Sequence, residues 1–475
     1  MAESTVSSRR LLTEVNFANR LSNRNYPMLK SRFLAALTLL LTATVGCNPT
    51  AEPTPSASVE PDTSAEPAPS FSAESAPLNV ITEDPEKVAA LEKAGFSFTR
   101  DQEGRITEFF VATETSIAEV LPNLQGVPNV RIARLSGPGL TDEGMEALEF
   151  LGVLQRLDLS DSAIGDKTLE TVGNLPFLEV LSLRRTSVSN DGLENLVTVS
   201  RLRALDLRNT KISDPGLANI AGLTNLIDLQ LEKTNCTDLG IESLASLPLK
   251  SLNVNYCTSI SDAALETLQN TSTLESIQFD YTKISDAGMP NLTKFPKLKR
   301  LRIRGTDVTG VGIANLAGST NLERAELRDS SLDDDGMAVL ATLPKMSYMD
   351  ISECRLVSPE GMQKLGEMAE LQVIILWETK ADDSVVNAIG DLKNVRQLDL
   401  KATSITDECV ESLIKLTNLE DLNVAGTQLS DESFRKLGGL PKLKKLNVAN
   451  TSIGFDVIDE LAEANENLQV IEFEN

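Results

Sequence analysis

The sequence contains no histidine and one tryptophan, and aromatic residues make up 4% of its 475 residues. Without histidine, Ser-His-Asp and Cys-His nucleophile pairs, His-ligated zinc and imidazole acid–base catalysis are excluded. No other residue pattern indicates catalysis, so we expect a protein that is not an enzyme and uses no cofactor. Its net charge of −25 argues against a nucleic-acid partner, because binding to phosphates requires a basic face.

Long hydrophobic runs are almost absent too. The one present, residues 33–46, is too short to span a membrane but has the length of a signal-peptide core, with Lys30 in its positive flank. It ends in the letters TVGC at residues 44–47, which resemble the lipobox of bacterial lipoproteins, although Thr44 stands where Leu is usual. The resemblance implies lipidation of Cys47. Ordinary signal cleavage is the alternative.

These features predict how the first part of the chain is organised. Residues 1–46 are interpreted as a leader with a signal peptide whose true start is Met28. Residues 47–78 are interpreted as the lipidated cysteine and a disordered stalk rich in Pro, Ser, Ala and Glu. We therefore expect a lipid-anchored protein of the cell envelope, or a secreted one, that touches the membrane through its lipid alone. Asn48 is not the Asp that favours inner-membrane retention, so the outer membrane is preferred.

The rest of the chain is a repeat that reads L-x-x-L-x-L-x-x-T-x-I-x-D-x-G-L-x-x-L-x-x-L. Its third apolar position recurs every 23 to 25 residues, most often every 24, at Val111, Leu135, Leu159, Leu183, Leu207, Leu231, Val254, Phe279, Ile303, Leu327, Ile351, Leu376, Leu400, Val424, Val448 and Phe473. The pattern resembles the leucine-rich repeat family over residues 106–475, with about 16 units of 24 residues. Residues 79–105, with an amphipathic segment at 88–94, are interpreted as an N-terminal cap.

The spacing of the apolar residues predicts the fold of each unit. Leu-x-Leu places two side chains on one face of a short strand, and G-L-x-x-L-x-x-L has helical spacing. No single unit can bury its leucines alone, so the units must stack. We expect an α/β fold, a right-handed leucine-rich repeat solenoid (horseshoe) with a parallel sheet on its concave side and helices on its convex side.

Three polar features of the repeat are interpreted as structural. The Thr column, for example Thr210, supplies hydroxyls to backbone groups where each strand turns. The Asp column, for example Asp214 after Ser213, marks helix starts through capping and the helix dipole. We therefore expect no metal site, and residues 333–335 are the one acidic cluster to test for calcium. The remaining thiols are interpreted as free and buried, and they are Cys236, Cys257, Cys354 and Cys409.

Outward positions on the expected concave face carry balanced charge, whereas the remainder of the chain is acidic. The tyrosines beyond the leader and the sole tryptophan all fall on these outward positions. Exposed aromatic and arginine residues are typical of binding hot spots. The candidate binding residues are Tyr348, Val373, Ile375, Trp377, Tyr256 and Tyr281, with a basic cluster of Arg300, Arg302 and Arg304 as the second surface.

These observations favour a monomeric, envelope-tethered module that binds a protein through its concave face. Two alternatives remain. The unit around Cys257 resembles the cysteine-containing repeats of F-box substrate receptors in ubiquitin ligases. Exposed aromatic rings would also suit a glycan- or peptidoglycan-binding module.

Overall fold

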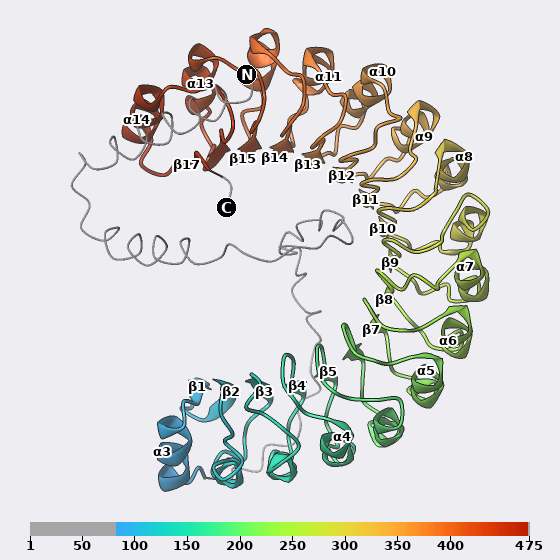
Figure 1. The fold of residues 1–475 in the computed structure, drawn as a ribbon, viewed down its shortest axis with the longest axis vertical. Coiled ribbons are helices and arrows are strands. Elements are labelled where there is room, and N and C mark those ends of the chain that lie inside the picture. Colours follow the sequence, from blue (N-terminus) through green and yellow to red (C-terminus); the bar gives the residue numbers. More distant parts are fainter. Residues whose placement is uncertain (1–81, 474–475) are drawn as a thin grey trace, which may run out of the picture. The chain divides into compact units, whose positions relative to one another are not determined.

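The computed structural model describes residues 82–473, so the leader, Cys47 and the stalk lie outside the described residues. The described part is an open α/β solenoid in which each repeat contributes one short strand (Figure 1). The strands are β1 (Ser97–Arg100), β2 (Ile106–Ala112), β3 (Ile132–Ser136), β4 (Arg156–Asp158), β5 (Val180–Ser182), β6 (Ala204–Asp206), β7 (Asp228–Gln230), β8 (Ser251–Asn253), β9 (Ser276–Gln278), β10 (Arg300–Arg302), β11 (Arg324–Glu326), β12 (Tyr348–Asp350), β13 (Val373–Ile375), β14 (Gln397–Asp399), β15 (Asp421–Asn423), β16 (Lys445–Asn447) and β17 (Gln469–Ile471).

The strands form one sheet in chain order. β1 pairs antiparallel with β2, and from β2 onward each strand pairs in parallel with the next, as far as β17. The register is constant, so that Leu205 lies beside Leu181 on one side and Leu229 on the other. Equivalent residues of successive repeats therefore form straight columns across the sheet.

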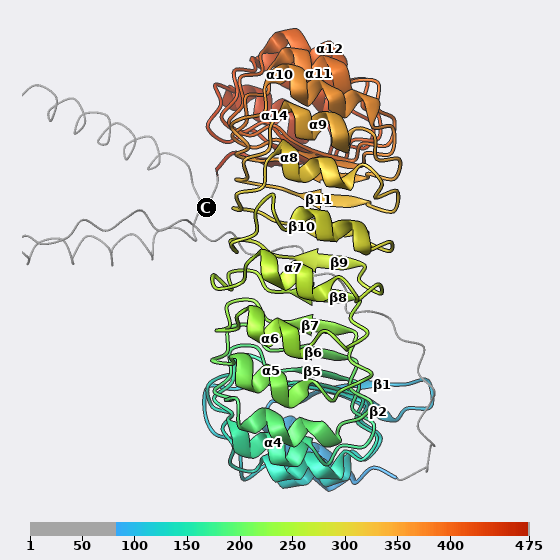
Figure 2. The same cartoon turned by 90° about the vertical axis from the view of Figure 1, so that its right-hand side faces the viewer.

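Helical segments cover the opposite side of the repeats (Figures 1 and 2). The α-helices are α3 (Pro85–Lys93), α4 (Asp166–Val172), α5 (Asp214–Ile220), α6 (Asp238–Ser243), α7 (Asp262–Leu268), α8 (Gly310–Ile313), α9 (Asp334–Leu340), α10 (Pro359–Met362), α11 (Asp383–Ile389), α12 (Val410–Leu413), α13 (Asp431–Gly438) and α14 (Phe455–Ala464). The 3-10 segments are η1 (Leu121–Gly126), η2 (Met145–Phe150), η3 (Gly192–Thr198), η4 (Met289–Lys294), η5 (Ala314–Leu316), η6 (Gln363–Glu367) and η7 (Asp407–Cys409).

The core is a continuous stack of apolar side chains between strands and helices. Leu205, Leu207 and Leu217 from one repeat are all at most 1% exposed, and their equivalents repeat along the chain. The Thr column closes the turn after each strand, because the Thr210 hydroxyl donates to the Leu207 carbonyl at 2.6 Å. Cys257 occupies the same column, and its Sγ contacts the Leu231 carbonyl at 3.2 Å. The structural interpretation of this column is confirmed.

The Asp column does more than start helices. Asp214 is the first residue of α5, as expected, but its carboxylate reaches the next repeat, where it accepts the Thr237 amide and hydroxyl protons, each at 2.7 Å. The same pair of bonds joins Asp262 to Ser285. The sequence analysis assigned these carboxylates to their own helices and missed this link between repeats.

The glycine of the D-x-G-L motif follows from the same contact. A Cβ on Gly240 would lie 2.5 Å from Asp214 Oδ1, and one on Gly288 would lie 2.4 Å from Asp262 Oδ1. At these two glycines a Cβ would require the carboxylate of the preceding repeat to shift. The requirement is local, because Ala264 and Cys409 occupy the equivalent position in their repeats, where Asp238 and Asp383 keep both bonds to Ser261 and Thr406. Gly240 and Gly288 make room for the clamp between their repeats.

The two ends of the described solenoid differ. At the start, α3 packs on η1, and Phe96, just before β1, packs against Phe109 of β2, with both rings buried. At the other end, Leu446 pairs with Val470, which places Glu472 rather than Phe473 opposite Val448. Phe473 is 74% exposed, so its assignment to the third apolar column was wrong.

Within residues 82–473 the thiols are free and buried, as expected for Cys236, Cys257, Cys354 and Cys409. Cys236 and Cys257 contact one hydroxyl, that of Thr234, at 3.3 and 3.5 Å, although they stand in different columns of the repeat. Within residues 82–473, none of the helices is both long and apolar enough to cross a membrane.

Candidate binding surface on the concave face

Four of the candidate residues gather on β12, β13 and the turn that follows β13. Tyr348 and Val373 are partners in the parallel register, and Ile375 and Trp377 follow Val373 at alternate positions on the same face. All four side chains are half-buried. We call these residues, Tyr348, Val373, Ile375 and Trp377, the Trp377 patch. The sequence placed them side by side, and the structure brings them together.

The aromatic rings of this patch have cations over them. The guanidinium carbon of Arg324 lies 3.6 Å from the ring centroid of Tyr348. Arg328 approaches the Trp377 ring to 4.3 Å and Lys401 to 5.2 Å, from repeats on either side of it. Such contacts stabilise the orientation of the rings. The rings are thus held in place before any partner arrives, which limits the side-chain entropy lost on binding.

One polar atom of the patch has no partner. The indole Nε1 of Trp377 is buried, and no described residue accepts a hydrogen bond from it. A buried donor without an acceptor costs free energy. An acceptor supplied by a bound partner would relieve that cost.

Tyr256 and Tyr281 form a separate stack, several repeats away. Their ring centroids are 4.8 Å apart at an interplanar angle of 17°. The Lys233 ammonium lies 4.8 Å from the Tyr256 ring, and a Cβ on Gly305 would lie 2.3 Å from Tyr281 Cε1. The stack is therefore enclosed on both sides by its neighbours. It does not join the Trp377 patch.

Both tyrosines of the stack have an unusual backbone. Tyr256 and Tyr281 have φ of +60° and +51°, in the left-handed region that costs free energy for bulky residues. The equivalent residue has positive φ in most repeats, and at Gly305 the value is +61°. The chain turns at this position after each strand. Its backbone conformation therefore sets the direction in which the Tyr256 and Tyr281 side chains project from the sheet.

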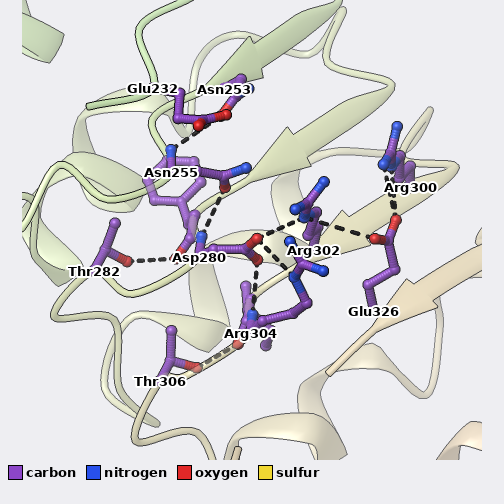
Figure 3. A network of polar contacts seen from close by, with 12 residues as sticks. Glu232, Asn253, Asn255, Asp280, Thr282, Arg300, Arg302, Arg304, Thr306 and Glu326 are labelled. Carbon is purple, nitrogen blue, oxygen red and sulfur yellow. Dashed lines mark hydrogen bonds and ion pairs between the residues drawn. The ribbon is translucent and has the colours of Figure 1, made fainter. Parts of the chain in front are cut away.

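The basic cluster is an ion-pair network rather than an exposed patch (Figure 3). Arg302 and Arg304 donate through Nε to Asp280 at 2.6 and 2.8 Å, and Asp280 is fully buried. Arg300 pairs with Glu326 at 2.9 Å. Arg300 and Arg302 are only 6% and 4% exposed. The expectation that these two arginines present charge to a partner is therefore corrected, and Arg304 is half-buried in the same network.

Asp350 and Asp399 differ from these paired carboxylates. Asp350, 6% exposed, accepts from the amide and hydroxyl of Ser352 at 3.0 and 2.6 Å. Asp399 accepts from the Lys401 amide at 2.8 Å and from Asn423 Nδ2 at 2.9 Å. Burial raises the pKa of Asp350, and it raises the pKa of Asp399 to about 6. The sequence analysis named neither residue.

The repeat architecture is matched by a family model described as "Leucine-rich repeat region", which covers residues 138–388. The chain belongs to the leucine-rich repeat family. The expected fold class is confirmed, and leucine-rich repeat solenoids serve in general as protein-interaction modules. No curated protein matches the chain.

Solved leucine-rich repeat structures resemble the chain at low identity. An internalin of Listeria monocytogenes is 19% identical with a TM-score of 0.41, over 82% of this chain and 94% of that chain. A leucine-rich repeat protein of Leptospira interrogans is 17% identical with a TM-score of 0.48, over 76% of this chain and 99% of that chain.

Other surfaces of the leucine-rich repeat domain are weaker candidates for a binding or metal site. A cavity of about 370 Å³ near β3–β6 is lined by arginines and aspartates that pair with one another, such as Arg184 with Asp161 at 2.6 Å. In the cluster at residues 333–335, two carboxylates have structural roles: Asp333 caps α9 by accepting from the Gly336 amide, and Asp334 accepts from the amide and hydroxyl of Ser358 in the next repeat. Across residues 82–473, no group of three or more Cys, Asp or Glu side chains is arranged to hold a metal ion.

Proposed function

We propose that this protein is a cell-envelope-tethered module that binds a protein partner through its concave face, centred on the Trp377 patch. The observation that supports this site is a cluster of half-buried apolar and aromatic side chains on a sheet whose other outward positions are largely polar. Hot spots of protein interfaces concentrate in such aromatic anchors surrounded by arginine. The partner would complete the burial of the patch.

Ring geometry favours a protein over a glycan. Sugars bind aromatic side chains by lying flat on a ring face. Here Arg328 and Lys401 lie over the Trp377 ring, and the faces of Tyr256 are shared between Lys233 and Tyr281. A sugar would have to displace these contacts. A protein can instead pack against ring edges and the adjacent Val373.

The test of the site is a substitution with a matched control. Trp377→Ala should weaken partner capture by at least about 2 kcal/mol, because truncating an aromatic anchor removes most of its contact area. Phe150→Ala is the control, since Phe150 is 44% exposed in η2 on the helical side. Both variants and the parent chain would be used in crosslinking capture from the native cell envelope, followed by affinity measurement with the captured protein. Normal binding by Trp377→Ala, with crosslinks on the helices, would refute the proposed site.

Tethering is proposed from the lipobox-like residues 44–47, which lie outside the described residues. In a bacterial host, Cys47→Ser should abolish labelling by a fatty-acid probe and leave soluble or uncleaved protein, because no other cysteine lies near the end of the signal core. Equal labelling of both forms would remove the lipid anchor from the proposal without affecting the binding site.

A further inference from the structure

One column of outward-facing side chains, formed by the last residue of each strand from β4 to β16, is polar except at the Trp377 patch. Asp350, Ile375 and Asp399 are successive partners in the register of β12, β13 and β14. From β3 to β16, Ile375 is the only apolar residue in this column. An apolar side chain is thus flanked on both sides by a carboxyl group. Neighbouring strands are spaced by about 4.8 Å, so a group above Ile375 lies about 5 Å from each flanking column.

In the described part of the chain, these two carboxyl groups are held by hydrogen bonds rather than by ion pairs. Their hydrogen bonds come from Ser352, Asn423 and the backbone, and among residues 82–473 neither Asp350 nor Asp399 forms an ion pair with lysine or arginine. By contrast, Asp280 and Glu326 on the preceding strands each bind more than one arginine. In the column that contains Asp350 and Asp399, the carboxylate nearest to the patch that has arginine partners among residues 82–473 is Glu326 of β11.

Nearby charges are engaged with other groups. Arg304 faces Asp350 but donates to Asp280, and Glu326 adds a like charge beside Asp350. Arg328 pairs with Glu353 at 2.7 Å. The Lys401 ammonium faces Asp399 and lies over the Trp377 ring.

Covering the patch would remove the remaining water from both carboxyl groups. A buried carboxylate without a counter-ion is costly, so an acidic or purely apolar partner segment would bind poorly there. A lysine or arginine can lay its aliphatic stem along Ile375 and Val373 while its charged end meets Asp350 and Asp399. The net charge of −25 would also attract a basic segment over longer distances.

We infer that the partner binds the Trp377 patch through a segment that places a lysine or arginine over Ile375, between Asp350 and Asp399, next to an apolar residue. This inference rests on the proposed function and adds the chemistry of the partner. It predicts a basic and apolar peptide rather than an acidic one.

The sole tryptophan of the chain is Trp377, so its fluorescence reports binding at this patch directly. The full chain is titrated with a nine-residue peptide of leucine, valine and serine that has one central lysine. Matched peptides carry acetyl-lysine or glutamate at the centre. At pH 7.5 the lysine peptide should bind about tenfold more tightly than the acetyl-lysine peptide.

The variant Asp350→Asn/Asp399→Asn should reduce that ratio to about threefold or less. Asp158→Asn, a change in the same column on β4, should leave the ratio unchanged. If the double variant does not fold, Asp399→Asn alone should lower the ratio. Lowering the pH from 7.5 to 5 should also weaken lysine-peptide binding, because the pKa of Asp399 is raised to about 6.

Equal or tighter binding of the acetyl-lysine or glutamate peptide would overturn the inference. So would a lysine preference that survives the double variant, or no change in Trp377 fluorescence with any peptide at millimolar concentration. In each of these cases the proposed function still stands if Trp377→Ala weakens capture of the native partner. Loss of the proposed function would appear instead as capture that Trp377→Ala does not affect.

Discussion

The clamp between repeats makes a quantitative prediction at Gly240. A Cβ at this residue would lie 2.5 Å from Asp214 Oδ1 and 2.8 Å from Leu217 Cδ1. In Gly240→Ala the Asp214 carboxylate must shift, and we expect it to lose one of its two hydrogen bonds from Thr237. Both need not be lost, because Ala264 occupies the equivalent position in the next repeat and Asp238 keeps its two bonds to Ser261. Hydrogen bonds to a charged acceptor contribute about 1.5–3 kcal/mol each, so the loss of one costs about 1.5–3 kcal/mol. Alanine recovers about 1 kcal/mol through its helix propensity in α6, which leaves a net destabilisation of about 0.5–2 kcal/mol.

Urea unfolding followed by circular dichroism measures this change, with the midpoint and the slope fitted separately. The control is Gly318→Ala, because a Cβ there meets nothing within 4 Å and its φ is not positive. That control should be neutral or slightly stabilising. In a double-mutant cycle, Asp214→Ala should absorb most of the cost of Gly240→Ala, since the clash then disappears. Additive effects, or equal stability of the Gly240 and Gly318 variants, would refute the clamp as the reason for this glycine.

Two further predictions concern the stability of the solenoid. Leu207→Ala should lower the free energy of unfolding by about 2–5 kcal/mol, because this side chain is fully buried between adjacent repeats. Deletion of residues 208–231, one period, should leave a folded, shorter solenoid. If the deletion variant unfolds while Leu207→Ala has no effect, the repeat register is wrong. Asp399 has a folded pKa of about 6, above its unfolded value of 3.8, so its contribution to stability is complete below pH 3.8 and is lost as pH rises through 6. Between pH 7 and pH 5 the free energy of unfolding of the parent chain should therefore increase by about 1 kcal/mol more than that of Asp399→Asn. The same pH dependence in both proteins would argue against a buried, uncompensated carboxyl group at Asp399.

The fold was predictable because its signals are local and periodic. The spacing of Leu205, Leu207 and Leu217 alone separates a strand from a helix, and repetition in phase leaves one way to bury them. The Thr210 hydroxyl was equally predictable, since its acceptor lies three residues earlier in the chain. For Asp214 the sequence predicted the helix start but not the link between repeats, because that link depends on Thr237 of the next repeat.

The candidate site was harder to predict, because its contacts also depend on residues of neighbouring repeats. An outward position in the sequence shows which face a side chain leaves from, but not what lies beside it on the neighbouring strands. Arg302 occupies an outward position and yet is buried, because Asp280 and Glu326 reach it from the strands on either side. Residues 22 to 26 positions apart meet in this way along the whole sheet, and a search for local clusters does not detect them.

This lateral pairing explains why the Trp377 patch differs from the rest of the concave face. Each strand presents the same outward positions, so a functional position must be recognised by what its lateral neighbours fail to supply. Asp280, just after β9, and Glu326 of β11 have arginine partners, whereas among residues 82–473 Asp350 of β12 and Asp399 of β14 form no ion pair and Ile375 lies between them. Unpaired polar groups beside an apolar side chain are costly in the free protein and become favourable only when a complementary group arrives. The same reasoning applies to Nε1 of Trp377, for which no described residue is an acceptor, so that a partner could satisfy three polar groups around one apolar cluster.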